Sequence, residues 1–102
     1  MGMLTGLGAS VDKTWSGIVA GRSGIAPITH FDCSAFSTRF AGLVPDFVVD
    51  DYMPAKEARR FDEFIQYGLA AGTQALADSG ITVSEANAAR IGVAVGSGIG
   101  GL

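Results

Sequence analysis

Cys33 and His30 are the one thiol and the one imidazole of this 102-residue chain, and they stand three positions apart. A thiolate attacks carbonyl carbons and an imidazole can accept the thiol proton, so the two side chains could form a nucleophile and its base. Such a thiol needs a cation or a helix N-terminus beside it, whereas the neighbour of Cys33 is the anionic Asp32. We therefore interpret Cys33 as a small loop side chain and His30 as a hydrogen-bonded structural residue.

A second group of residues could bind an anion. Three of the seven basic residues, Lys56, Arg59 and Arg60, fall within five positions. At helical spacing these cations share a face and repel one another unless an anion lies over them. The three acidic residues between positions 57 and 63 could supply that charge, which would make a solvated mixed-charge face. The alternative is a docking patch for an acidic partner, because a small basic island on a chain of net charge −3 steers association.

A third candidate is the glycine loop, which we define as residues 96–101, Gly-Ser-Gly-Ile-Gly-Gly. It follows residues 91–95, whose apolar sequence predicts a buried strand, and it contains the spacing GxGxxG. One hypothesis is a phosphate-binding turn, which also requires a helix and then an acidic residue after the loop. The other is steric: glycines let the backbone pass close to a ligand or another segment, with Ile99 as the large side chain.

The elements that must position these residues follow from the apolar periodicity. Residues 10–20 predict a short helix with Ser10 as its N-cap and Gly21 after its end. Residues 25–49 predict short extended pieces and turns, and residues 54–79 predict the longest helix, closed by Gly80. Gly68 and Gly72 lie on the apolar face of that helix and predict tight packing there. A short turn at residues 84–90 and the strand at 91–95 complete an α/β order.

Composition limits the class of protein. A chain of this length with 48% hydrophobic and 17% charged residues forms one folded domain at most. Its mean hydropathy of +0.35 and its 15 glycines predict that it is a piece of a larger body. Net charge −3 gives no support for a nucleic-acid surface. We expect no membrane span and no signal peptide, and hence a cytoplasmic protein. One cysteine and one histidine exclude a disulfide within the chain and a multi-cysteine zinc site, and we expect no metal.

Several segments, in their order along all 102 residues, resemble the N-terminal part of the β-ketoacyl-acyl-carrier-protein synthases, and within them synthase II. They are Thr14-Trp15, residues 20–25 (AGRSGI), Phe31-Asp32, residues 40–42 (FAG), 56–62 (KEARRFD), 64–67 (FIQY), 78–80 (DSG), 90–92 (RIG) and 96–101 (GSGIGG). Ile99 and residues 64–67 favour synthase II over synthase I.

This resemblance implies a thiolase-like fold with layers in the order α-β-α-β-α. Residues 1–102 would be an incomplete N-terminal portion of one synthase domain, with the first core strand missing and Gly6 where proline is usual. The family's cysteine nucleophile and its two catalytic histidines are expected downstream of Leu102. The resemblance therefore implies no catalytic residue in this chain, no catalytic role for Cys33, and no activity of the chain alone.

The resemblance also implies a function. The family elongates fatty acids by decarboxylative condensation of malonyl-acyl-carrier-protein with an enzyme-bound acyl thioester, uses no metal or organic cofactor, and usually forms homodimers. Lys56, Arg59 and Arg60 match the basic patch that receives the acyl carrier protein. Ile99, with Gly98 and Gly100, matches the wall of the acyl pocket. A dinucleotide-binding domain that uses residues 96–101 and a non-catalytic interaction fragment remain the alternatives.

Overall fold

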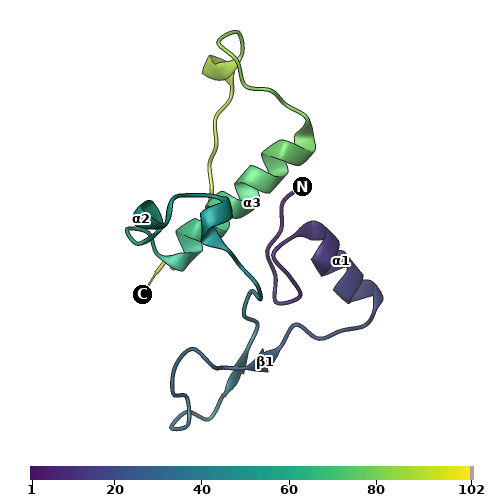
Figure 1. The fold of residues 1–102 in the computed structure, drawn as a ribbon, viewed down its shortest axis with the longest axis vertical. Helices are drawn as coiled ribbons and strands as arrows, with labels where there is room; N and C mark the ends of the chain where they lie inside the picture. The colour runs from purple at the N-terminus through teal and green to yellow at the C-terminus, as the bar shows by residue number, and fades with distance from the viewer. Residues whose placement is uncertain (102) are drawn as a thin grey trace. The chain divides into compact units, whose positions relative to one another are not determined.

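The computed structural model describes residues 1–101, which form two compact units; Leu102 lies outside the described residues. One unit consists of residues 3–48, and the other of residues 1–2 with 49–101. The helices and strands, in chain order, are α1 (Val11–Val19), β1 (Ala26–Pro27), β2 (Phe40–Ala41), α2 (Ala55–Ala58) and α3 (Glu63–Ser79), with 3-10 turns η1 (Val49–Asp51) and η2 (Ala88–Arg90) (Figure 1). Helices and a small sheet agree with the expected α/β class.

In the first unit, α1 begins and ends where the sequence predicts. The Ser10 hydroxyl accepts a hydrogen bond from the Lys13 backbone N–H at 3.3 Å, which satisfies one of the free donors at the helix start. Gly21 has φ +66°, the left-handed conformation that ends many helices and that glycine adopts without strain. The predicted caps of this helix are therefore confirmed.

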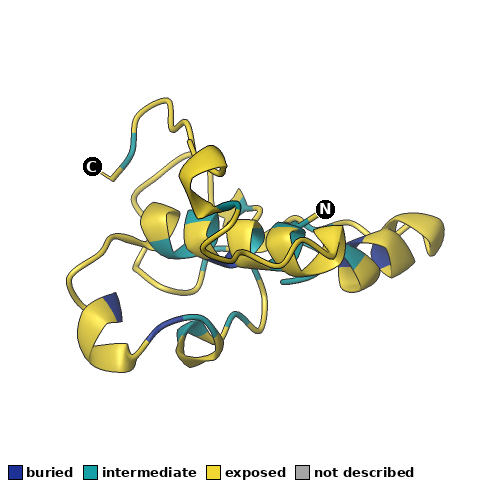
Figure 2. Cartoon of the chain, turned by 90° about the horizontal axis from the view of Figure 1, so that it is seen from above, coloured by how far each residue is buried: buried dark blue, intermediate teal, exposed yellow. Residues whose placement is uncertain are grey.

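The face that α1 buries is small and partly polar. Thr14 and Gly17 are its buried residues, and the Thr14 hydroxyl lies 2.8 Å from the Thr5 hydroxyl. Thr5 and Gly8 exchange backbone hydrogen bonds of 2.9 and 3.1 Å, so α1 packs on a tight turn. By contrast, Trp15 is 64% exposed, and Figure 2 shows how much of the chain is exposed in this way.

The strands β1 and β2 form a two-stranded antiparallel hairpin. Ala26 pairs with Ala41 and Pro27 with Phe40, and the Ile28 N–H donates to the Arg39 carbonyl at 3.0 Å beyond the last pair. Short strands joined by a long loop confirm the prediction of extended pieces and turns for residues 25–49.

The second unit contains two helices where the sequence predicted one. The expected helix over residues 54–79 was wrong, because α2 ends at Ala58 and α3 begins at Glu63. Between them Asp62 is extended, with φ −64° and ψ 157°, and starts α3 as its N-cap. The Asp62 side chain makes no capping hydrogen bond, so it is the extended backbone at Asp62 that separates the two helices. Gly80, with φ +69°, closes α3 as predicted.

α3 is the element on which this unit is built. Ala70 is completely buried, and the Gln74 amide donates to the Tyr52 hydroxyl at 2.8 Å. The Gly2 backbone lies against Ala71, so closely that any side chain on Gly2 would collide with the helix. The amino group of Met1 forms an ion pair with Asp78, which lowers the pKa of that carboxyl.

Residues 91–95 do not form the strand that their sequence predicts. Strands are stabilised by hydrogen bonds to a neighbouring strand, and within the described part of this unit residues 91–95 have none. Val93 is accordingly 85% exposed. The prediction of a buried strand was therefore wrong for this structure. At the end of this segment the Val95 side chain lies 3.5 Å from the position of a Cβ on Gly68 of α3.

Candidate functional site

The basic residues singled out in the sequence lie at the end of α2. Lys56 belongs to α2, Arg59 is the residue that caps it, and Arg60 follows in the turn toward α3. We call residues 56–60 the cation turn. All three basic side chains are exposed. Among residues 1–101 the single ion pair joins Met1 to Asp78, so none of the three cations takes part in one.

The local mixed-charge explanation for these cations thus finds no ion pair in the structure. Glu57, Asp62 and Glu63 are all exposed beside the cation turn, and exposed pairs of this kind contribute little even where they form. The exposure of these acidic and basic side chains agrees with a solvated mixed-charge face and equally leaves the basic side chains accessible to an external anion.

Gln66 of α3, which had no predicted role of its own beyond the resemblance of residues 64–67, supports the cation turn. The Gln66 amide nitrogen donates to the Ala58 carbonyl and to the Phe61 carbonyl, both at 3.0 Å. The sequence carried one hint, since Gln66 is a polar residue in the largely apolar segment at residues 64–69. Spacing alone could not show which carbonyls its amide would reach.

A long apolar groove runs along α3 in the same unit. It has a volume of about 710 Å³ and is lined by one face of α3, by Val83 in the segment before η2, and by residues of the extended chain after η2. Its lining is predominantly apolar: Phe64, Ile65, Gly68, Leu69, Gly72, Thr73, Leu76, Val83, Ile91, Val93, Val95, Gly96 and Ser97. The tight packing predicted at the two glycines is found at neither. A Cβ on Gly68 would lie 3.5 Å from the Val95 side chain, an ordinary contact, and a Cβ on Gly72 would have no neighbouring atom within 4 Å.

The glycine loop folds back toward the start of α3. Gly100 has φ +76°, and a Cβ on Gly100 would lie 3.3 Å from the Phe64 ring. The backbone N–H of Gly100 donates a hydrogen bond to the Ser97 hydroxyl at 3.1 Å. Ile99 is 78% exposed, and Gly98 has open space around it. The loop therefore presents one large apolar side chain between glycines.

Cys33 and His30 do not form a catalytic pair in this structure. The His30 ring contacts the Phe31 ring edge-on at a centroid distance of 4.8 Å, and the half-buried Cys33 thiol lies 3.9 Å from the Ile28 carbonyl. The Ser34 N–H donates to the Asp32 carboxylate at 3.0 Å and lowers the pKa of that acid, which keeps a negative charge beside Cys33. The exposed His30 thus makes a ring contact in place of the hydrogen bond that the sequence predicted for it, and Cys33 is a small loop side chain as expected.

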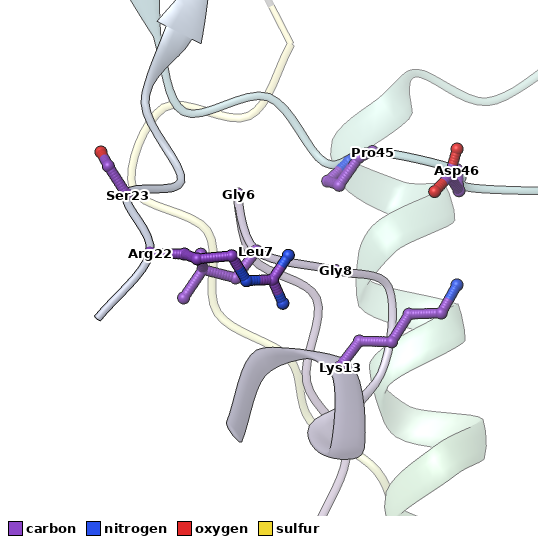
Figure 3. Close-up of a pocket in the computed structure, with 8 residues that line it drawn as sticks. All are labelled: Gly6, Leu7, Gly8, Lys13, Arg22, Ser23, Pro45 and Asp46. Carbon is purple, nitrogen blue, oxygen red and sulfur yellow. The ribbon is translucent and has the colours of Figure 1, made fainter. Parts of the chain in front are cut away.

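A further hollow in the first unit was not predicted. It encloses about 420 Å³ and is lined by Gly6, Leu7, Gly8, Lys13, Arg22, Ser23, Pro45 and Asp46 (Figure 3). Lys13 reaches it from α1, and Arg22 from the segment that follows α1. Nothing in the spacing of these residues along the sequence indicates that they meet.

The remaining structural tests concern metals, membranes and ionisation. Within residues 1–101, no three side chains of the His, Cys, Asp or Glu type gather as a metal site would need. No helix in that described range has both the length and the apolar character needed to cross a bilayer. Burial raises the pKa of the Tyr67 hydroxyl, and the charge of Glu63 raises it further.

The family model and the relatives that match the chain are synthases by name. The family model described as "Beta-ketoacyl synthase, N-terminal domain" matches residues 1–102. The 3-oxoacyl-[acyl-carrier-protein] synthase 2 of Vibrio cholerae is 62% identical over all 102 residues, which cover 25% of that relative. The proteins of the same name from Coxiella burnetii and Synechocystis are 43% and 42% identical over the whole chain, which covers 25% and 24% of their lengths.

A solved structure is also similar. The chain matches "The ishigamide ketosynthase/chain length factor" with a TM-score of 0.67 and 34% sequence identity, over 79% of this chain and 20% of that one. The chain spans about a quarter of the length of the synthase 2 relatives described above.

Proposed function

Residues 1–102 belong to the β-ketoacyl synthase family, in its N-terminal domain, and from this premise we propose that the chain supplies the carrier-docking surface and part of the acyl pocket of a fatty-acid condensing enzyme. The reaction is decarboxylative condensation of malonyl-acyl-carrier-protein with an enzyme-bound acyl thioester. The proposed partner is the acidic acyl carrier protein, which binds at Lys56, Arg59 and Arg60.

One observation carries the docking proposal. Three of the seven basic residues of an acidic chain gather in the cation turn, all exposed and none in an ion pair among residues 1–101. Cations on an exposed turn attract an acidic partner at a distance, and their contribution falls as salt screens it.

The test uses a hybrid enzyme in which residues 1–102 replace the matching residues of the Vibrio cholerae relative. Reversing Arg59→Glu and Arg60→Glu together should raise KM for carrier-protein thioesters by about tenfold or more. KM for a small acyl thioester should stay unchanged, because a small thioester does not contact the docking surface. The difference should shrink as salt concentration rises.

A matched control reverses two other exposed basic residues. Lys13→Glu with Arg22→Glu changes the net charge by the same amount in the other unit of the chain. We expect it to leave the ratio of the two KM values unchanged. Equal effects of both double variants, or equal effects on both substrates, would rule out docking at the cation turn. An inactive unmutated hybrid would count against the proposal that this chain serves as a working segment of such an enzyme.

The acyl-pocket part of the proposal concerns Ile99, with Gly98 and Gly100 beside it. In the proposed reaction the acyl chain is transferred to the family's cysteine, malonyl loses carbon dioxide, and the resulting carbanion attacks the thioester. The family's histidines and backbone N–H donors stabilise the oxyanion that forms. The exposed Ile99 side chain would meet the alkyl tail and limit its length.

The remaining parts of the proposal come from the family resemblance. We propose the layered α-β-α-β-α arrangement for the complete domain, a homodimeric enzyme, a cytoplasmic location, and a reaction that needs no metal or organic cofactor. Two observations argue against dinucleotide binding by residues 96–101. The family that matches is a synthase family, and the strand that should precede the motif is not formed in the described chain.

A further inference from the structure

We propose that Gln66 is a positioning residue for carrier-protein docking, an inference that rests on the proposed function of the cation turn. Its side-chain amide fixes the backbone on both sides of Arg59 and Arg60. It touches neither the partner nor the reacting atoms.

The geometry behind this proposal is a two-point clamp. The two N–H groups of one amide nitrogen are donated to the Ala58 carbonyl and the Phe61 carbonyl, each at 3.0 Å. Arg59 and Arg60 are the two residues between those carbonyls. A movement of the turn that carries either carbonyl away from α3 would lengthen one of the two bonds.

The clamp adds to the hydrogen bonds that this short turn already makes. Carbonyls at the end of a helix lack the partners that the next turn would supply, and α2 has only four residues. The turn itself supplies the Arg60 N–H to Glu57 carbonyl bond at 2.9 Å and the Phe61 N–H to Ala58 carbonyl bond at 3.1 Å. On the apolar side, buried Ala58 anchors α2. Gln66 adds the link from this short turn to the 17-residue helix α3.

A fixed turn matters for a charged docking site because ordering flexible cations on binding costs conformational entropy. With the clamp intact, Arg59 and Arg60 meet the partner from a fixed backbone. Without it, the same charges remain but must be ordered during docking. We therefore expect loss of Gln66 to weaken carrier-protein binding and to spare the chemical step.

The experiment compares two glutamines of α3 in the hybrid enzyme. Gln66→Met keeps the length of the side chain and removes both donors, and should raise KM for carrier-protein thioesters about three- to tenfold with kcat unchanged. KM for the small thioester should stay the same. Gln74→Met is the matched control: Gln74 is also half-buried and donates outside its own helix, to Tyr52, but does not reach the cation turn.

Combining Gln66→Met with the Arg59→Glu and Arg60→Glu reversal provides a second measurement. If Gln66 acts through the arginines, its effect on KM should disappear once they are reversed. If Gln66→Met does not fold, Gln66→Asn, whose amide is one methylene too short to reach both carbonyls, carries the same expectation.

Each outcome has a defined meaning. A normal KM for Gln66→Met, an equal rise for both substrates, or an equal rise for Gln74→Met would overturn the positioning role while docking at the arginines stands. An arginine reversal without effect would overturn docking itself, and the role of Gln66 with it.

Discussion

Ile99 is the residue at which a change of bulk should alter substrate range. It is the large side chain of a loop otherwise made of glycine and serine, and the neighbouring Gly98 leaves open space. In the hybrid enzyme, Ile99→Phe should lower kcat/KM for the longest acyl chains, by about tenfold for each methylene that no longer fits. A series of acyl chain lengths measures this, with Ile81→Phe, also an exposed isoleucine, as the control. An unchanged profile would remove Ile99 from the pocket.

The sequence predicted the exposure or role of a residue where these depend only on the residue itself and its neighbours in the chain. Exposure of Lys56, Arg59 and Arg60 follows from their charge, and the structural interpretation of Cys33 follows from its acidic neighbour. The role of Gln66 could not be predicted in the same way. It depends on the distance between one amide and two carbonyls five and eight positions earlier, which the fold of the turn decides.

At the scale of elements, capping residues in the sequence predicted where helices end, but the apolar spacing did not predict where a helix is interrupted. Ser10, Gly21 and Gly80 each act on the adjacent turn, and all three helix ends were confirmed. The break before α3 was missed because the apolar spacing persists across it, although Asp62 offered a helix start. The strand predicted at residues 91–95 was wrong for a different reason. A strand needs a partner strand, and no described segment of this unit provides one.

The turn beneath α1 gives a stability prediction of its own. The Gly6 and Gly24 backbones touch: a Cβ on Gly6 would lie 2.5 Å from the Gly24 carbonyl oxygen, and backbone atoms cannot move aside as a flexible side chain can. Gly6→Ala should therefore lower the free energy of unfolding by about 1 to 3 kcal/mol. At Gly42 the nearest atom to a Cβ is the end of Ile25 at 3.6 Å, an ordinary contact. Gly42→Ala should change stability by less than about 1 kcal/mol, of either sign.

Denaturant unfolding of the two alanine variants checks this difference. Equal stability of the Gly6→Ala and Gly42→Ala variants would show that the contact between Gly6 and Gly24 does not constrain the folded state.

For the whole molecule, the main observation is how little apolar surface the described chain covers. Met53, Ala58 and Ala70 are its buried apolar residues, while large side chains in both units are exposed. Patches of this kind mark surfaces that bind other protein, and the chain spans about a quarter of its curated relatives. The hydropathy of the sequence predicts a piece of a larger body, and this stays a prediction. The division into two units has no counterpart in composition. The expectation of a single incomplete domain over residues 1–102 stays a prediction.

Activity is the prediction that belongs to this scale. We expect the 102-residue chain alone to show no condensing activity with malonyl-acyl-carrier-protein and an acyl donor, because neither Cys33 nor His30 has the surroundings of a catalytic group. The assay follows release of carbon dioxide, with the complete Vibrio cholerae relative as the positive control. Turnover by the chain, abolished by Cys33→Ser, would contradict the structural role given to that cysteine.

The exposure of Trp15 on α1 gives the chain a built-in optical reporter. It is the sole tryptophan of the sequence, so the indole emission of the chain arises from one known position. An indole that faces water emits at longer wavelength than one that has become covered by protein. A blue shift on adding a polypeptide that contains no tryptophan would therefore show that Trp15 becomes covered, without a label and without altering a residue of this chain.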